Sequence, residues 1–548
     1  MNRWLTVPAL ALLFAALTLP AAAAHPTDRV FSHGARTAGT DSDPIVPDPQ
    51  ITPPPTASCS VTLFTAYPFQ NFTPATGTYA PPAYCPGPWS KVILSVTTSV
   101  QGVQYDRVGA LWIGNDEIYR FTTSEPPGQK IQWTVNKDVT EYSNALASPS
   151  TYTYSLGNVV NSQYTGIYYV TATLTFYETA SGYPAPPVPD AIIPIAAAGS
   201  SPPWYTLNDA SDQATSSVTV PPNTQSAVLE LYASGHICEE FWYANESDAF
   251  ESQLGSSCGG TAYREIDVSI DGKPAGVAEA YPYLYTGAID PIAWLPLTGY
   301  NTLDLPPYTF DLTPFVGYLN DGNPHTIAAQ VYNDTGGFWL VDGDLLITED
   351  HGSTQTTGAL VSSSGGFTNP ERYWEHLSVE TGGSAYYEGF DEIQAQGYVN
   401  TSQGRITTTL SEHVSSADGQ ILTQPESPQG TQTVSLNAKS VTAETSTVGS
   451  STTTTTTTMS WPFSLAITHG LAISQPFHQY VSTNANGTST WASKDVVVTE
   501  ASGGGKQNTS VNFQLHNSAG YCFDRTLTGS SGHLLTDKQA CHLYHQGP

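Results

Sequence analysis

Residues 167–177 read I-Y-Y-V-T-A-T-L-T-F-Y, and runs of this kind decide the fold class of the chain. The run is short and consists mostly of β-branched and aromatic residues, which pack well on the pleated surface of a sheet. Similar runs occur at 91–100, 107–114 and 131–135, and glycine, proline, asparagine or aspartate bounds them. Short strands at this spacing predict a β-sandwich or a jelly roll.

A second block of strand-like runs follows the segment Y-P-A-P-P-V-P-D (183–190), which is typical of a linker. The runs of this block are 228–236, 265–272, 308–316, 325–332 and 338–347. Beyond about residue 350 the chain is rich in threonine, serine and glycine with alternating apolar residues, which indicates further strands. The threonine run 452–458 fits a strand, a loop or a glycan-bearing stalk.

A chain of 548 residues is too long for one compact core, so several domains are expected. We expect an all-β protein in which two adjacent jelly-roll or β-sandwich domains precede a β-rich C-terminal domain. The expected boundaries are 1–24 for a signal peptide, 25–57 for an extended leader, 58–180 for the first jelly roll, 181–203 for a linker, 204–350 for the second jelly roll and 351–548 for the Ser/Thr-rich C-terminal domain.

The first residues carry the features of a secretory signal. A short basic start precedes an apolar run from Leu5 to Leu19, and small residues follow it before a cut expected near Ala23 or Ala24. The apolar run is too short for a good membrane span, and no later stretch reaches the required length. We therefore expect a secreted or periplasmic protein without membrane association.

Six cysteines fit an exported protein, because oxidising compartments favour disulfides. They fall into three local pairs, although sequence alone leaves other connectivities open. The expected pairs are Cys59 with Cys85, Cys238 with Cys258, and Cys522 with Cys541. No C-x-x-C motif occurs, which argues against a cysteine metal site, and we expect no metal and no cofactor.

The charge balance is acidic and the total charge is low. The chain has 47 acids against 17 Lys plus Arg, a net charge of −30, and only 12% charged residues. This composition argues against a nucleic-acid partner, which would require basic patches. It suggests an acidic working environment, in which protonation of carboxylates would reduce the self-repulsion of the chain.

The string V-Q-Y-D-R-V-G (103–109) places Asp106 and Arg107 where a loop enters a strand. A carboxylate followed by a guanidinium group, beside Tyr105 and Trp112, is a candidate catalytic acid with its orienting cation. A structural ion pair or a turn aspartate is the alternative interpretation.

The string S-G-H-I-C-E-E-F-W-Y-A-N (234–245) crowds two carboxylates against a cysteine, a histidine and three aromatic rings. Neighbours in a strand point to opposite faces, so we expect only one of Glu239 and Glu240 to face a site, with Asp106 as the second carboxylate. Aromatic rings beside carboxylates suit sugar rings, whose apolar faces stack and whose hydroxyls donate to the acids. An edge strand with exposed acids is the alternative.

Three further groups are candidates. His236 is a possible acid, base or hydrogen-bond partner, and at acidic pH we expect it to be cationic and to pin Glu239 or Glu240. The aromatic loop at 292–296 fits carbohydrate contact or sandwich core. Asp342 and Asp344 form a D-x-D pair that could bind calcium, a weak signal by itself.

Together these strings resemble the peptide N-glycosidase A family, the acid-active peptide-N4-(N-acetyl-β-glucosaminyl)asparagine amidases. The similar segments are 105–126, 133–142, 164–177, 234–245 and 336–345, and the resemblance covers roughly 57–350. A more distant resemblance is to the F-type bacterial peptide N-glycosidase, which is built of two adjacent jelly rolls. Its aromatic-Asp-Arg string is similar to Tyr105-Asp106-Arg107 here.

The resemblance implies roles for the candidate residues. Asp106 would be the primary catalytic residue, and Arg107 would hold it or a sugar oxygen. Glu239 or Glu240 would supply the second acid. A further first-domain carboxylate would fall near 157–163, a stretch that contains none. The residues implied to contact substrate are Tyr105, Arg107, His236, Trp242, Tyr243 and Trp294.

The implied reaction is hydrolysis of the β-aspartylglucosylamine bond, which releases the glycan and converts asparagine to aspartate. The expected partner is an N-glycopeptide or N-glycoprotein, and we expect a monomer. Three alternatives stay open: a glycoside hydrolase that uses the same carboxylates, an acid peptidase, and a carbohydrate-binding or adhesive protein without turnover.

Overall fold

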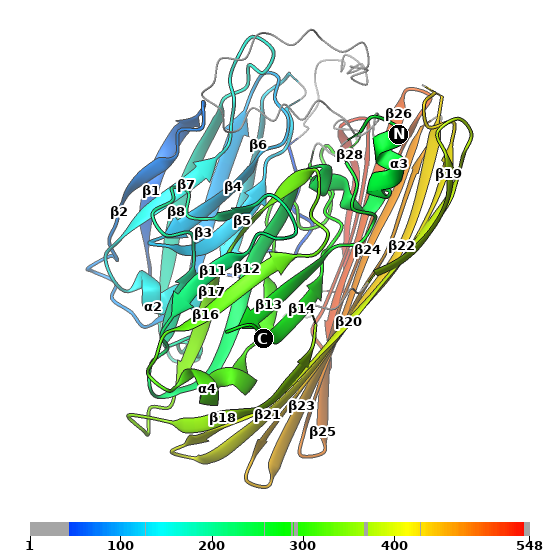
Figure 1. Ribbon diagram of the computed structural model, residues 1–548. Coiled ribbons are helices and arrows are strands. Elements are labelled where there is room, and N and C mark those ends of the chain that lie inside the picture. Colours follow the sequence, from blue (N-terminus) through cyan, green and yellow to red (C-terminus); the bar gives the residue numbers. More distant parts are fainter. Residues whose placement is uncertain are drawn as a thin grey trace.

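The computed structural model describes residues 43–126, 128–256, 258–286, 289, 294–366, 371–427, 429–468 and 470–541. The expected signal peptide and the first part of the expected leader lie outside the described residues. Strands dominate the described chain and the helices are short, so the all-β prediction is confirmed (Figure 1). Among the described residues, no helix combines the length and the apolar character needed to cross a membrane.

The first domain is a jelly roll. Strands β1, β8, β3 and β6 form one antiparallel sheet, and β2, β7, β4 and β5 form the other. Alternating apolar and aromatic side chains from both sheets enclose its core. Its elements are Ser58–Phe69 (β1), Ala75–Tyr79 (β2), Trp89–Val100 (β3), Val108–Ile113 (β4), Asp116–Thr122 (β5), Ile131–Asp138 (β6), Thr140–Tyr142 (η1), Ser143–Leu146 (α2), Ser150–Leu156 (β7) and Tyr168–Glu178 (β8).

The second domain repeats the same strand order. Strands β10, β17, β12 and β15 form one sheet, and β11, β16, β13 and β14 form the other. Counted from the first strand of each roll, both domains therefore have the order 1-8-3-6 and 2-7-4-5. The elements are Tyr205–Leu207 (β10), Ala214–Val218 (β11), Thr224–Ile237 (β12), Cys238–Ala244 (η2), Asp248–Gln253 (α3), Glu265–Ile270 (β13), Lys273–Glu279 (β14), Tyr308–Asp311 (β15), Thr313–Phe315 (η3), Val316–Leu319 (α4), His325–Val331 (β16) and Gly337–Glu349 (β17).

The segment expected to be a linker contains a strand. Ala191–Ile195 (β9) lies within 181–203 and pairs with β17, which adds it to the edge of the second domain. The proline-rich part, 183–190, has no strand.

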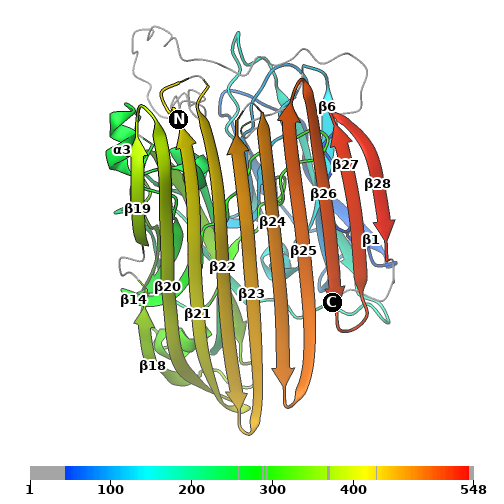
Figure 2. The ribbon, with the colours of Figure 1, turned by 90° about the vertical axis from the view of Figure 1, so that its right-hand side faces the viewer.

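The C-terminal part is one long antiparallel meander whose strands follow each other across the sheet in chain order (Figure 2). Both β18 and β19 pair with β20, at different positions along it. The threonine run 452–458 lies inside β23. The strands are Thr357–Gly365 (β18), Glu371–Ser378 (β19), Gly382–Thr401 (β20), Gly404–Thr423 (β21), Thr431–Val448 (β22), Ser451–Ile467 (β23), Leu471–Ala485 (β24), Thr488–Gly503 (β25), Lys506–Asn517 (β26), Cys522–Ser530 (β27) and His533–Ala540 (β28).

One face of this C-terminal sheet packs on the second jelly roll (Figure 1). In β20 buried and exposed residues alternate, as expected for a strand with one covered face. The Tyr243 ring meets the Phe463 ring edge-on at 4.7 Å, and the core cluster runs without interruption from the second roll into the sheet. The C-terminal sheet therefore shares a core with the second roll.

A buried arginine joins the two jelly rolls. Arg120, on β5 of the first roll, donates two hydrogen bonds to Glu117 at 2.6 and 2.7 Å. It also pairs with Asp342 on β17 of the second roll and donates to the Leu340 carbonyl at 2.8 Å. Trp112 donates to the other oxygen of Asp342 at 2.7 Å. Because all these charges are buried, the network fixes how the two rolls sit against each other.

All three expected disulfides are present. They join Cys59 to Cys85, Cys238 to Cys258 and Cys522 to Cys541.

Candidate active site

The topology brings loops from both jelly rolls together. With the strand order of these rolls, the connections between strands 3 and 4 and between strands 5 and 6 emerge at the same end. Asp106 lies between β3 and β4, and Glu240 lies between β12 and β13, the equivalent connection of the second roll. The 5–6 connections touch as well, because the Thr286 hydroxyl donates to the Thr123 carbonyl.

The first roll supplies two carboxylates. Strands β4 and β5 form a hairpin in which Val108 is opposite Thr122, so the residues just outside this pair are also neighbours. The Asp106 backbone N–H donates to Glu125 Oε1 at 3.2 Å. Glu125 was missed in the sequence. The hairpin turn at Gly114 is the signal that could have placed it beside Asp106.

Arg107 lies in this loop, buried beneath an aromatic layer. Its guanidinium carbon is 3.5 Å from the centre of the Tyr105 ring, a cation–π contact, and the Tyr164 ring lies further out at 5.9 Å. Nη2 donates to Gln104 Oε1 at 2.7 Å, whereas Nε is buried without a hydrogen-bond partner in the described chain.

The segment after Ile237 differs from the expected strand. β12 ends at Ile237, whose φ of +65° is unusual for a β-branched residue, and 238–244 forms two short 3₁₀ turns with a kink at Phe241. The alternation rule for strands therefore does not apply to Glu239 and Glu240. The two side chains still point into different surroundings, because they occupy successive positions of a helical turn beside the Cys238–Cys258 disulfide.

Both carboxylate oxygens of Glu239 accept hydrogen bonds from other residues of the second roll. Its carboxylate forms a two-point ion pair with Arg264, at 2.6 Å to Nε and 2.8 Å to Nη2. Trp339 Nε1 donates to it at 2.9 Å, and the Thr335 backbone N–H donates at 3.2 Å. The side chain is completely buried, and its bonds leave no room for a role toward substrate.

Glu240 is the acid that meets the first roll. Desolvation by the surrounding protein raises the pKa of its carboxyl well above the usual range, although part of the residue remains exposed. The negative charges of Asp106 and Glu125 raise this pKa further. Three carboxyl groups from two domains therefore act on one another at this end of the rolls.

The expected aromatic contacts divide into two groups. Tyr243 and Tyr285 lie close enough to Glu240 for its charge to raise their pKa beyond the effect of burial, and Tyr285 donates to the Gly235 carbonyl at 3.1 Å. The Tyr243 hydroxyl is buried without a hydrogen-bond partner in the described chain. Trp242 and Trp294 are buried core residues, so a glycan would not reach them in this arrangement.

His236 lies at the edge of the site, stacked on Phe338 with ring centres 4.8 Å apart. Burial and, to a smaller extent, the charge of Arg120 lower the pKa of its imidazole to about 3. This corrects the expectation of a cationic histidine at acidic pH, since the ring is neutral above about pH 4. Its polar neighbour is Ser234 Oγ at 3.4 Å.

The D-x-D pair does not form a cation site. Both oxygens of Asp342 are occupied, one by Arg120 and the other by Trp112. Asp344 accepts a hydrogen bond from the Tyr142 hydroxyl at 3.3 Å.

Fold and site together define a class: tandem jelly-roll proteins in which equivalent loops of the two rolls converge on a cluster of carboxyl groups and aromatic rings. The chain belongs to the peptide N-acetyl-β-D-glucosaminyl asparaginase amidase A family, whose model matches residues 47–365. This range contains both jelly rolls and every site residue described above.

A curated relative is the peptide-N4-(N-acetyl-β-glucosaminyl)asparagine amidase A of Prunus dulcis, 32% identical over 363 residues. The alignment spans 61% of this chain and 61% of that relative. Among solved structures, PNGase F, a glycosylasparaginase from Flavobacterium meningosepticum, is similar at 14% identity and a TM-score of 0.34, over 54% of this chain and 96% of that one. PNGF-II is similar at 15% identity and a TM-score of 0.39, over 54% of this chain and 65% of that one.

Proposed function

We propose that this protein is a peptide N-glycosidase that hydrolyses the amide bond between an asparagine side chain and the first sugar of an N-glycan. One observation carries the proposal: Asp106, Glu125 and Glu240 come together from two domains inside the range matched by the family. Family membership and the name of the Prunus dulcis relative support the same reaction.

In the proposed reaction, water attacks the amide carbonyl carbon and the C–N bond breaks. The nitrogen leaves with the glycan as a glycosylamine, and the peptide keeps an aspartate. Asp106 accepts the proton of the attacking water, as a carboxylate general base, and passes it to the departing nitrogen as the C–N bond breaks. Glu125 contacts the backbone of Asp106 and holds its loop in place.

Glu240 acts in its protonated form. Because its pKa is raised, the carboxyl keeps its proton at acidic pH and can donate a hydrogen bond to the amide oxygen. The developing negative charge on that oxygen strengthens this hydrogen bond in the transition state. Glu239 has no role in this step, because Arg264 occupies its carboxylate.

The sugar side of the site is aromatic. Tyr105 and Tyr164 are partly exposed, and their rings lie next to the guanidinium group of Arg107, the residue that follows Asp106. Aromatic rings of this kind suit the apolar face of an N-acetylglucosamine residue. The proposed substrate contacts leave out Trp242 and Trp294.

The proposed setting is extracellular or periplasmic, and acidic. The signal sequence expected at the N-terminus, the three disulfides and the net charge of −30 support it. The proposed working form is a monomer, with a glycopeptide or glycoprotein as its partner and no nucleic acid or membrane.

Mass spectrometry of a defined N-glycopeptide, incubated with the protein at about pH 5, tests the reaction. We expect an intact free glycan and a peptide that is about 1 Da heavier than the unglycosylated Asn peptide, because Asn becomes Asp. We expect Asp106→Asn to lower the rate by about 10²-fold or more, since it removes the general base. The variant should keep the fold, because the asparagine side chain has nearly the same shape as the aspartate that it replaces.

Other products would overturn the proposal. A peptide that keeps an Asn-linked N-acetylglucosamine would identify a glycoside hydrolase that uses the same carboxyl groups. A cut in the peptide backbone would identify a peptidase. Full activity in Asp106→Asn would remove this residue from the mechanism, and binding without any product would identify a lectin.

A further inference from the structure

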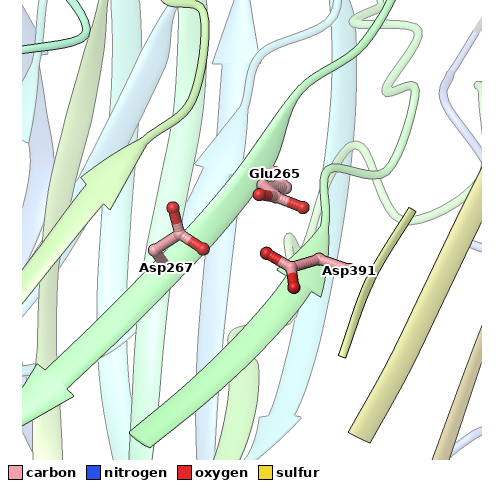
Figure 3. Close-up of side chains that lie close together, drawn as sticks. All are labelled: Glu265, Asp267 and Asp391. Atoms are coloured by element: carbon pink, nitrogen blue, oxygen red, sulfur yellow. The ribbon is translucent and has the colours of Figure 1, made fainter. Parts of the chain in front are cut away.

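Three buried carboxyl groups meet between the second jelly roll and the C-terminal sheet, away from the site above. Glu265 and Asp267 lie on β13, two residues apart and therefore on one face of the strand, and Asp391 lies on the covered face of β20. Figure 3 shows the three carboxyl groups turned toward one another. One oxygen from each lies within 4.8 Å of one oxygen from each of the others.

Each carboxyl group has one oxygen that the protein satisfies. Glu265 Oε2 accepts from the Tyr263 hydroxyl at 2.5 Å. Asp267 Oδ2 accepts from Gln330 Nε2 at 3.3 Å. Asp391 Oδ1 accepts from the backbone N–H groups of Glu392 at 2.6 Å and Gly366 at 3.2 Å. These bonds fix the orientation of all three groups.

The second oxygen of each group has no hydrogen-bond partner among the described residues. These atoms are Glu265 Oε1, Asp267 Oδ1 and Asp391 Oδ2, and their residues are 0%, 2% and 4% exposed. Buried polar atoms in folded proteins almost always have a partner, and an unpaired buried carboxylate is especially costly. Glu265 and Asp391 are close enough to share a proton in a hydrogen bond, and a bound cation would satisfy all three atoms when the groups are ionised.

No basic side chain of the described chain neutralises the cluster. Arg264 is adjacent to Glu265 in sequence, but its guanidinium pairs with Glu239. The ion pairs of the described residues include none with Glu265, Asp267 or Asp391. A bound cation would supply the missing positive charge.

We propose that Glu265, Asp267 and Asp391 bind one Ca²⁺ ion that fastens the C-terminal sheet to the second jelly roll. Carboxylate oxygens are hard ligands, which Ca²⁺ and Mg²⁺ prefer over softer metals such as Zn²⁺. Ca²⁺–oxygen bonds are about 2.4 Å long, so two oxygens on one ion lie at most about 4.8 Å apart. The spacing in the cluster meets this limit, and the flexible coordination of Ca²⁺ tolerates it better than the strict octahedron of Mg²⁺.

The position of the cluster gives the ion a structural role. It crosses the contact between β13 and β20, two strands more than a hundred residues apart in the chain. Ca²⁺ bound there stabilises the folded state in proportion to the logarithm of its concentration above Kd. The proposal is independent of the amidase reaction and can be tested without measuring activity.

Isothermal titration with CaCl₂ at about pH 7.5, on full-length protein treated with EDTA and desalted, tests the proposal. We expect one high-affinity ion per chain and a Tm that rises on addition of Ca²⁺. Weak binding of many ions to the acidic surface, without a single tight site and without a change in Tm, would overturn it.

Two matched variants locate the site. Asp391→Asn keeps the shape and removes one ligand charge, so we expect at least a tenfold weaker Kd and loss of the Tm shift. Asp418→Asn is the control, because Asp418 is also a buried aspartate of the C-terminal sheet, on β21, but it lies outside the cluster. Loss of Ca²⁺ binding in the control, or its retention in Asp391→Asn, would contradict the assignment.

A measurement on the unmodified protein keeps the test valid if Asp391→Asn does not fold. Tb³⁺ substitutes for Ca²⁺ and emits light when a nearby aromatic ring transfers energy to it, and the Tyr263 hydroxyl touches Glu265 directly. We expect Tb³⁺ emission on excitation of tyrosine, and its loss when Ca²⁺ is added in excess. Absence of an emission that Ca²⁺ displaces would overturn the proposal.

Discussion

Glu239 and Glu240 are neighbours in the chain, yet their carboxyl groups lie in opposite electrostatic surroundings. Glu239 faces the guanidinium of Arg264, whereas Glu240 faces the negative charges of Asp106 and Glu125. The first arrangement stabilises a charged carboxylate, and the second favours a protonated carboxyl group. Replacing each glutamate by glutamine, which keeps the shape of the side chain, should therefore affect stability at Glu239 and activity at Glu240.

Glu240→Gln should abolish most of the activity and leave the fold intact. The amide of glutamine can still donate a hydrogen bond, but it is a weaker donor than a carboxylic acid, so we expect kcat to fall by about 10²-fold. Stability should stay the same or rise, because a desolvated carboxyl group is replaced by a neutral amide. Turnover of the glycopeptide, followed together with Tm, checks this expectation, and unchanged kcat would exclude Glu240 from the reaction.

Glu239→Gln should instead destabilise the protein. It leaves Arg264 buried without its counter-charge, and breaking a buried ion pair in this way costs about 3–5 kcal/mol. Urea unfolding monitored by tryptophan fluorescence measures the loss. If both variants lost the same amount of stability, the contrast between the two glutamates would be wrong.

Some residues of the candidate site could be predicted from the sequence. Asp106 and the aromatic strings stood out as local patterns, and the need for a second acid from the Glu239–Glu240 pair followed from them. Glu125 did not stand out, because only the register of the β4–β5 hairpin brings it to Asp106. The sequence left the choice between the two glutamates open, and the strand expected there is a 3₁₀ segment over 238–244.

Strands β5 and β17 belong to different rolls, and Arg120 connects them. Glu117 and Asp342 are both buried around its guanidinium group, with side chains at most 1% exposed. The site depends on this connection, because Asp106 and Glu240 reside on different rolls.

Arg120→Gln should destabilise the protein and lower its activity together. It leaves two buried carboxylates without a cation, which we expect to cost about 3–5 kcal/mol. Lys91→Gln is the control, since Lys91 and Asp138 form an exposed pair on the first roll, worth at most about 1 kcal/mol. Chemical unfolding and glycopeptide turnover of both variants are the measurements. Equal losses in the two variants would show that the Arg120 network does not hold the rolls.

The strands themselves were largely predictable, because residue type and turn signals indicate them locally. β9 was not, since its neighbours in sequence are prolines and its pairing with β17 is a long-range contact. Nothing in the sequence indicated that both rolls share one strand order.

At the scale of the whole molecule, buried carboxyl groups recur in many places. Burial raises the pKa of Asp116 and Glu444 to about 7 and that of Asp334 to about 8. In the unfolded chain these groups have pKa values of about 4. The folded state therefore binds more protons than the unfolded state between these values, and folding becomes less favourable as the pH rises.

We predict that Tm is highest near about pH 4–5 and falls as the pH rises to about 8. Each such group costs up to about 1.4 kcal/mol per pH unit between its unfolded and folded pKa values. Calorimetric scans at constant ionic strength check the trend, and Asp334→Asn should flatten it. A Tm that rises over the same range of pH would contradict the prediction.

The covered face of the C-terminal sheet was beyond prediction from sequence. Alternation in β20 indicates one buried face, but many surfaces could cover it, and only the folded chain shows that the second roll does so. The meeting of Asp391 with Glu265 and Asp267 follows from that packing.

Because both rolls have the same strand order, the loop before the fourth strand of the first roll has an equivalent in the second roll. Arg107 directly precedes the fourth strand of the first roll, and Arg264 directly precedes the fourth strand of the second. At the position before the arginine, the first roll has Asp106 and the second has Tyr263. In the second roll the arginine pairs with Glu239 and so anchors the helical turn that contains Glu240. If the first roll carries the base and the second roll positions the acid, neither roll would be active alone.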